Sequence, residues 1–341
     1  LPLIPLDNGR DHARPTTRGP ATLAELDRTL DGLAARAAAG EIQAVGITGK
    51  SYILAAGADL SEVSKLPSRE IAKLIAQRGH QTLGRLSELG VPSFAFVNGL
   101  ALGGGLEIAL NSTYRTVDAS AAAIALPEVF IGLIPGWGGA YLLPNLIGIE
   151  NALEVVISNP LKQNRMLKPQ QAFELGIMDA IFPASTYLES SLRWADGVLT
   201  GAIKVTRKNE PGKMERLTKW PIAIKVARNM LESRIGTVPR SPYVALDLHE
   251  KARSGTTAEG FAREDEALSA PVAGGAPPGR RHRHGPGPRT ARTPLRDKAF
   301  LIGEASAGAA GQLWGEGPPA QSVPQGGQIV LGHPPSFPVP D

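Results

Sequence analysis

The chain has 341 residues, is 42% hydrophobic and carries a formal net charge of +4 at neutral pH. It contains no cysteine, which excludes disulfides, cysteine–zinc sites and a thiol nucleophile, and which fits a reducing compartment. No apolar run reaches the roughly 18 residues that a membrane span needs, and the opening LPLIPLDNGR lacks a secretory signal pattern. We therefore expect a cytoplasmic protein without a membrane span.

The first predicted elements alternate between helix and strand. Residues 21–39 place leucines at helical spacing, and Gly40 is a plausible helix stop. The run IQAVGIT (42–48) is typical of a buried strand. The small-residue run 54–60 then predicts a turn into a polar helix from about 61 to 89.

The same alternation continues along the chain. SFAFV (93–97) predicts a second buried strand, a helix is expected from about residue 104, and strands are expected near 113–118 and 123–126. Residues 150–200 read mostly as helices. Strands that alternate with helices in this way indicate an α/β fold with largely parallel strands.

The last 71 residues differ in character, with thirteen glycines and thirteen prolines among them. This density predicts a disordered tail. The tail holds seven Lys/Arg against four Asp/Glu, so most of the positive excess lies there and no nucleic-acid surface is expected on the folded part. We expect a main domain over residues 1–200, a helical extension over 201–268 and the tail over 269–341.

The stretch ALGGGLEIAL (101–110) sets three glycines at the start of an apolar helix and places Glu107 inside it. A helix that follows a strand presents unpaired N–H groups at its tip. Glycines allow a ligand to approach that tip closely, and the partial positive charge suits an oxygen that gains negative charge. Tight helix–sheet packing is the alternative explanation for the glycines.

A second glycine turn, AAGADL (55–60), also follows a strand and precedes a helix. With these two turns the sequence resembles the enoyl-CoA hydratase/isomerase (crotonase) superfamily, whose fold is a β/α spiral. The segments that carry the resemblance are Ala56–Leu60, Asn98–Gly99 with Gly103–Glu107, Pro127–Glu128 with Gly132–Gly139, and Ala172–Asp179.

The resemblance implies an enoyl-CoA hydratase that adds water to a trans-2-enoyl-CoA without a metal or redox cofactor. It implies that the N–H groups of Ala58 and Gly104 form an oxyanion hole. Glu107 would act mainly on the water and Glu128 would mainly supply the proton. The residues implied to contact the substrate or its coenzyme A part are Ala56, Gly57, Asp59, Leu60 and Gly136.

Within the superfamily, the segments LGGGLEIAL and LPEVFIGLIPG are most similar to the hydratase part of multifunctional fatty-acid oxidation α-subunits. Those proteins continue into an NAD-binding domain, but no G-x-G-x-x-G pattern follows residue 200 here. We expect the tail to be an out-of-frame or truncated ending. The resemblance implies an acyl-CoA thioester as ligand and either a homo-oligomer (trimer or hexamer) or a thiolase subunit as partner.

Three other interpretations stay open at this point. A Δ3–Δ2 enoyl-CoA isomerase would use the same fold, and the chain could instead be an inactive remnant. Residues 44–51 (AVGITGKS) satisfy a loose P-loop pattern, which would indicate an NTPase, although a P-loop needs a helix directly after Lys50. His12, His80 and His249 belong to no recognisable constellation.

Overall fold

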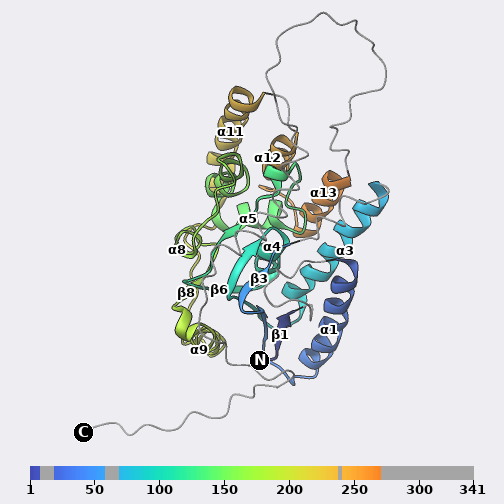
Figure 1. The fold of residues 1–341 in the computed structure, drawn as a ribbon, viewed down its shortest axis with the longest axis vertical. Coiled ribbons are helices and arrows are strands. Elements are labelled where there is room, and N and C mark those ends of the chain that lie inside the picture. Colours follow the sequence, from blue (N-terminus) through green and yellow to red (C-terminus); the bar gives the residue numbers. More distant parts are fainter. Residues whose placement is uncertain (8–18, 58–68, 237–239, 270–341) are drawn as a thin grey trace, which may run out of the picture.

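The computed structural model describes residues 1–7, 19–57, 69–236 and 240–269 (Figure 1). Its strands, in chain order, are β1 Leu3–Leu6, β2 Val45–Gly49, β3 Tyr52–Ala55, β4 Ser93–Val97, β5 Gly99–Leu102, β6 Tyr114–Asp118, β7 Ile124–Ala125 and β8 Ala180–Phe182. Its longer helices are α1 Pro20–Ala38, α3 Arg69–Glu88, α4 Gly104–Asn111, α5 Gly139–Ile147, α9 Tyr187–Leu199, α11 Lys219–Ile235, α12 Ser241–Lys251 and α13 Thr257–Ser269. Its shorter helices are η1 Glu128–Ile131, α6 Ile149–Leu153, η2 Glu154–Ser158, α7 Asn159–Leu161, α8 Pro169–Glu174, η3 Ala184–Thr186 and α10 Lys213–Leu217.

The described strands form two parallel sheets. The larger has the order β1-β2-β4-β6-β8, and the smaller has the order β3-β5-β7. After each of β2, β4 and β6 the chain passes directly to a strand of the smaller sheet. Three successive turns of the chain therefore add one strand to each sheet, which makes a spiral. The predicted α/β fold with parallel strands is confirmed.

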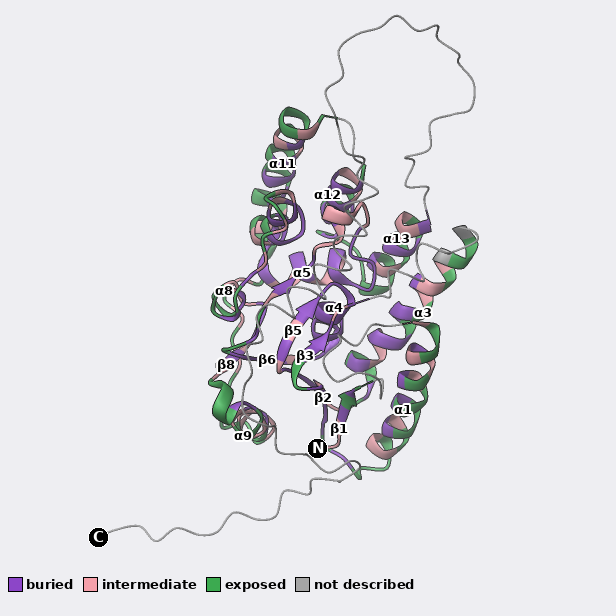
Figure 2. Cartoon of the chain, in the orientation of Figure 1, coloured by how far each residue is buried: buried purple, intermediate pink, exposed green. Residues whose placement is uncertain are grey.

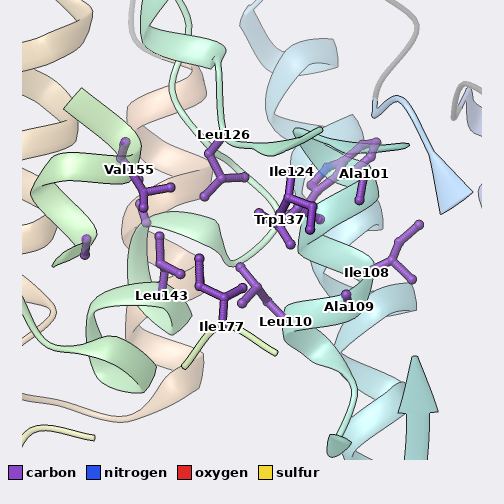
Figure 3. Packing of buried hydrophobic residues seen from close by; sticks show 14 of the residues in the cluster. Ala101, Ile108, Ala109, Leu110, Ile124, Leu126, Trp137, Leu143, Val155 and Ile177 are labelled. Atoms are coloured by element: carbon purple, nitrogen blue, oxygen red, sulfur yellow. The ribbon is translucent and has the colours of Figure 1, made fainter. Parts of the chain in front are cut away.

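The middle of this spiral is apolar on every side. All five residues of β4 are buried, as expected for a parallel strand covered on both faces. All eight residues of α4 are buried as well, so this helix runs through the core (Figure 2). Figure 3 shows side chains from β5, α4, β7, α5 and η2 meeting there. Any polar side chain on α4 is therefore carried into the interior.

The helices after residue 200 pack at one end of the molecule, where α12 and α13 contact α5 and α11 packs against α12 and α6 (Figure 1). Trp220 on α11 is fully buried, and its Nε1 donates a hydrogen bond of 2.9 Å to the carbonyl of His249 on α12. Helix α13 lies against α3, which comes from the first third of the chain. The segment beyond residue 200 thus contributes to the same hydrophobic core as the sheets.

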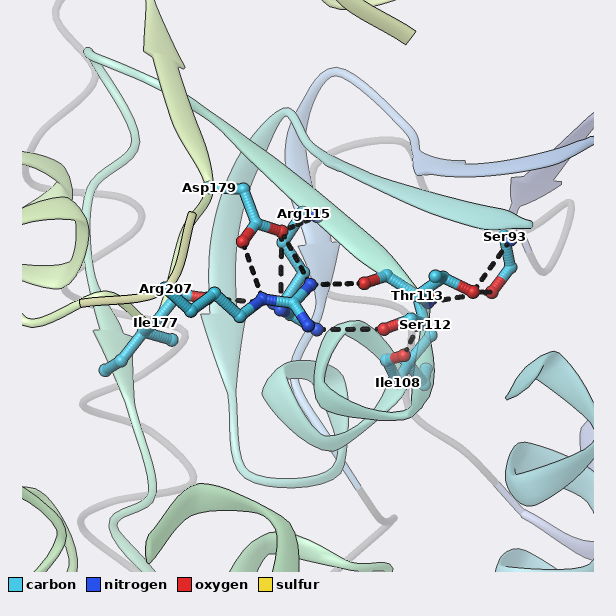
Figure 4. A network of polar contacts seen from close by, with 8 residues as sticks. All are labelled: Ser93, Ile108, Ser112, Thr113, Arg115, Ile177, Asp179 and Arg207. Atoms are coloured by element: carbon cyan, nitrogen blue, oxygen red, sulfur yellow. Dashed lines mark hydrogen bonds and ion pairs between the residues drawn. The ribbon is translucent and has the colours of Figure 1, made fainter. Parts of the chain in front are cut away.

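A buried ion-pair network ties β6 to the segment before β8 (Figure 4). Arg115 is 2% exposed; its Nε donates to the carbonyl of Ile177 at 2.9 Å, and one terminal nitrogen lies 3.3 Å from Asp179. Asp179 also accepts hydrogen bonds from the backbone of Arg115 and, at 3.0 Å, from Arg207. Asp179, the last residue of one family-like segment, therefore has a structural role in this fold.

Several local predictions are wrong. Residues 54 and 55, expected to begin a turn, are the last two residues of β3, and 99–102 and 180–182 are strands that were not expected. These strands are only three or four residues long, which gives a periodic pattern too little length to be seen. The P-loop interpretation is also wrong, because β2 occupies the supposed loop and strand β3, not a helix, follows it.

Other predictions lie outside the described residues. Ala58, Asp59, Leu60 and the tail from residue 270 onward belong to this group. The division at residues 200 and 268 stays a prediction. Among the helices that the structure describes, none has the length and apolar character to cross a bilayer.

Candidate active site

The three glycines before and in α4 are required for three different reasons. Gly103 has a φ of +53°, and a Cβ at this position would lie 2.5 Å from Oε1 of Glu128. A Cβ at Gly104 would lie 2.7 Å from the Trp137 ring, and one at Gly105 would lie 2.1 Å from the carbonyl oxygen of Ala55. No side chain fits at any of the three positions without a shift of its neighbours. Tight packing against neighbouring protein atoms, together with the positive φ of Gly103, accounts for the three glycines.

The two glycine turns meet at the start of α4. Gly57 is buried with a φ of +85°, and a Cβ on it would lie 3.0 Å from the backbone nitrogen of Gly104. Gly104 is the first residue of α4, so its N–H is one of the four that a helix leaves unpaired within itself. The structure brings Ala56 and Gly57 next to Gly104, while Ala58 lies outside the described residues.

Glu107 sits one turn into α4 with only 2% of its surface exposed. Its Oε1 accepts hydrogen bonds from the backbone N–H groups of Trp137 at 2.7 Å and Gly139 at 2.8 Å. One turn later on α4, the Asn111 side chain donates to the carbonyl of Trp137 at 2.9 Å. Helix α4 thus holds the segment that leads into α5 through both a carboxylate and an amide.

Glu128 is the first residue of η1, at the end of the loop that follows β7. The residue as a whole is half-buried, but its Oε2 is fully enclosed and has no hydrogen-bond partner among the described residues. Its Oε1 lies over Gly103, the residue that precedes α4. Glu107 accepts N–H groups from the distant segment at Trp137 and Gly139, whereas the backbone donor that acts on Glu128 is its own N–H group.

The surroundings of Glu107 and Glu128 raise the pKa of both carboxyl groups, but to different extents. Burial and, after it, the charge of Glu264 raise the pKa of Glu107, the two N–H groups and His80 oppose this rise, and the resulting pKa is about 7. Burial also raises the pKa of Glu128 well above its ordinary value, and the neighbouring charge of Glu107 adds to the rise. Each negative charge makes the other less favourable, and the two N–H groups favour the charged form of Glu107.

Gly136, expected to contact substrate, is buried, and a Cβ there would lie 2.0 Å from the side chain of Leu268 on α13. Trp137 is 5% exposed, and its ring lies among the core side chains shown in Figure 3. In this structure both residues pack against neighbouring elements.

Sequence reasoning missed two residues beside this site. His80 on α3 and Glu264 on α13 are both buried, and they lie 3.0 Å apart at their closest side-chain atoms. One pattern could have indicated Glu264, because it shares the helical face of Phe261 and Leu268 at i, i+3 and i+7 spacing. A carboxylate on an otherwise apolar face predicts a buried partner.

Solved structures of other proteins share this fold. An enoyl-CoA hydratase from Bacillus anthracis aligns with a TM-score of 0.51 at 24% identity, covering 74% of this chain and 93% of that chain. DspI from Pseudomonas aeruginosa aligns with a TM-score of 0.51 at 24% identity, covering 73% and 88%. Such likeness shows the fold alone, which is the crotonase-like α/β fold.

The sequence comparisons are more specific. The family model described as enoyl-CoA hydratase/isomerase matches residues 21–231, and the chain belongs to this family. The fatty acid oxidation complex subunit alpha of Shewanella amazonensis is 37% identical over 186 residues, covering 54% of this chain and 25% of that protein. Its counterpart from Pseudomonas putida strain F1 is 32% identical over 262 residues, covering 74% and 34%. The chain thus spans about a third or less of the length of these relatives.

Proposed function

We propose that this protein hydrates trans-2-enoyl-CoA thioesters to 3-hydroxyacyl-CoA, with Glu107 and Glu128 as the catalytic residues. The single observation that carries the proposal is the unequal surroundings of two buried carboxyl groups. One accepts two backbone N–H groups and favours the charged form, whereas the other has an unpartnered oxygen and favours the neutral form. Addition of water needs one base and one acid at neutral pH.

In the proposed reaction, the Glu107 carboxylate takes a proton from water while the water oxygen forms a bond to C3. The π electrons of the C2–C3 bond then move toward C2 and the thioester carbonyl. Glu128 delivers its proton to C2, which completes the addition. Transfer of the proton from Glu107 back to Glu128, directly or through water, restores the starting state.

The carbonyl oxygen gains negative charge during this addition. We propose that the N–H groups of Gly104 and Ala58 stabilise it, and that Ala56, Gly57, Asp59, Leu60 and Gly136 line the path of the acyl-CoA. A helix N-terminus is suited to this role because its N–H groups and dipole face the oxygen. The close approach of Gly57 to the nitrogen of Gly104 supports a shared site.

The test is a hydration assay on the full chain with crotonyl-CoA. Because each carboxyl group is asked to transfer a proton, Glu107→Gln and Glu128→Gln are each expected to lower kcat by about 10²–10⁴-fold. Glu150→Gln, at an exposed glutamate on α6, is the matched control and should retain wild-type activity. Wild-type turnover in either active-site variant would contradict the proposal.

Product analysis separates this activity from the isomerase alternative. Only hydration yields a 3-hydroxyacyl thioester, whereas an isomerase converts a 3-enoyl-CoA into a 2-enoyl-CoA without adding water. Formation of the conjugated thioester alone would favour the isomerase. Absence of both products would favour an inactive remnant.

A further inference from the structure

Glu264, on helix α13, is buried to 1% exposure and faces the same backbone segment that holds Glu107. Its Oε2 accepts a hydrogen bond from the N–H of Gly138 at 2.7 Å, and its Oε1 accepts one from Tyr141 at 2.7 Å. Glu107 binds the N–H groups of residues 137 and 139 in the same stretch. Two carboxylates from opposite sides therefore hold the start of α5 between them.

Two carboxylates, Glu107 and Glu264, lie on either side of the start of α5, and His80 supplies a positive charge beside them. Its Nε2 lies 3.0 Å from Glu264 and its Nδ1 lies 2.7 Å from Asp265, while its ring stacks on Phe261 at 4.3 Å. Burial lowers the pKa of His80, but the hydrogen bonds to and charges of Asp265 and Glu264 outweigh it and raise the pKa to about 9. At neutral pH an imidazolium thus offsets the charge of Glu264 beside Glu107.

Helix α13 also fits this segment sterically. A Cβ at Gly136 would meet Leu268 at 2.0 Å, and one at Gly260 of α13 would meet the Tyr141 ring at 2.2 Å. Both contacts depend on the absence of a side chain at a glycine. Helix α13 lies beyond residues 21–231, which the family model matches.

We propose that Glu264 is a positioning residue of the active site, held in place by His80, and that helix α13 completes the site by fixing the Trp137–Tyr141 backbone that binds Glu107. This inference rests on the proposed function for its catalytic consequence. The fixing of the backbone itself is independent of which reaction the site performs.

The proposal has an electrostatic consequence as well. The charged groups that face Glu107 are Glu128 from η1, Glu264 from α13 and His80 from α3. Glu264 raises the pKa of Glu107 and His80 lowers it. Removal of the Glu264 charge, with His80 still paired to Asp265, therefore lowers the pKa of Glu107 and moves the acid limb of the pH–rate profile to lower pH.

The decisive comparison is Glu264→Gln with Asp265→Asn, because both residues bind His80 but only Glu264 binds the start of α5. Backbone hydrogen exchange of the full chain, followed by mass spectrometry, is measured for residues 137–141. Loss of a charged acceptor is expected to speed exchange there by about tenfold in Glu264→Gln. Residues 93–97 in β4 serve as an internal reference and should not change in either variant.

In the crotonyl-CoA assay, Glu264→Gln should show a lower kcat with little change in KM and the acid limb shifted to lower pH. Asp265→Asn should retain wild-type exchange at 137–141, because Glu264 keeps its bonds to Gly138, Tyr141 and His80. Wild-type exchange at 137–141 in Glu264→Gln, or the same change in both variants, would overturn the proposal. Should Glu264→Gln not fold, Glu264→Asp replaces it: the shorter acid must also speed exchange at 137–141 while β4 stays protected.

The exchange measurement needs no substrate, so its outcome is separable from that of the proposed function. If Glu107→Gln were fully active, the hydratase mechanism would fail while the exchange result would still decide the role of Glu264. If exchange were unaffected while both glutamine variants of the catalytic pair were inactive, only the role of Glu264 would fail.

Discussion

His249, near the end of α12, is a titratable side chain with no exposed surface. Neither ring nitrogen has a hydrogen-bond partner of normal geometry among the described residues. Burial lowers the pKa of His249 to about 4, and the nearby backbone of Ala152 and Ala245 offsets only part of this effect. The folded protein therefore holds a neutral imidazole that the unfolded chain would protonate at a higher pH.

This difference predicts a pH-dependent stability. Between about pH 6.5 and 4 the unfolded state binds more protons at His249, so stability is full above this window and falls as the pH drops through it. Relative to His249→Leu, the wild type should lose up to about 3 kcal/mol of unfolding free energy across the window.

Urea unfolding of the two proteins at several pH values measures this difference. Because both proteins keep Glu107, Glu128 and His80, subtraction removes the contributions of those groups, which titrate with raised pKa values. Parallel stability curves from pH 7 to 4 would show that His249 does not contribute.

Helix α4 contains glycines, which are unfavourable inside a helix but which its close packing requires. Glycine is costly inside a helix, yet Gly105 allows α4 to approach strand β3 until a Cβ would lie 2.1 Å from the carbonyl oxygen of Ala55. That close approach carries Glu107 into the core beneath the loop that leads into α5. The glycines thus allow α4 to lie where it does, and the position of α4 determines the position of Glu107.

The prediction for this element compares two glycine-to-alanine changes in helices. Gly105→Ala should lower the unfolding free energy by about 1–3 kcal/mol, because the backbone at Ala55 cannot yield easily. Gly32→Ala, at an exposed position of α1 with no atom within 4 Å of the new Cβ, should instead raise it by about 0.4–1 kcal/mol. Chemical denaturation measures both, and equal effects would contradict the packing argument.

The whole molecule depends on contacts between segments far apart in sequence. Asp179 binds Arg115 of β6 and Arg207 of the loop before α10, so one carboxylate links three parts of the chain (Figure 4). The Asp179 and Arg115 side chains are 2% and 3% exposed. Burial lowers the pKa of Arg115 to about 10, but it stays charged at neutral pH and needs its partner.

Asp179→Asn should therefore destabilise the protein by about 3–5 kcal/mol, since it leaves a buried guanidinium without its counter-charge. Glu189→Gln, which breaks the exposed i,i+4 pair with Arg193 on α9, is the matched control and should change stability by no more than about 0.5 kcal/mol. Thermal and urea unfolding of both variants tests this. A small loss in Asp179→Asn would contradict the dependence of Arg115 on this counter-charge.

Much of this architecture could be predicted from the sequence alone. The leucine spacing of α1, the all-apolar run of β4 and the glycines before Glu107 each reflect a local requirement, namely period, burial on two faces or absence of a side chain. Such requirements act within one element, so they are visible in a short window. The α/β class and the family resemblance followed from several of these signals in order.

Only the tertiary structure decided what lies opposite each element. The smaller sheet β3-β5-β7 joins strands of two to four residues, which are too short to show a period. His80 and Glu264 are 184 positions apart, and their contact depends on α13 folding back against α3. A hydrogen bond between distant segments produces no periodic pattern in the sequence of either segment. The two side chains come together only when the chain folds, so the contact is visible only in the tertiary structure.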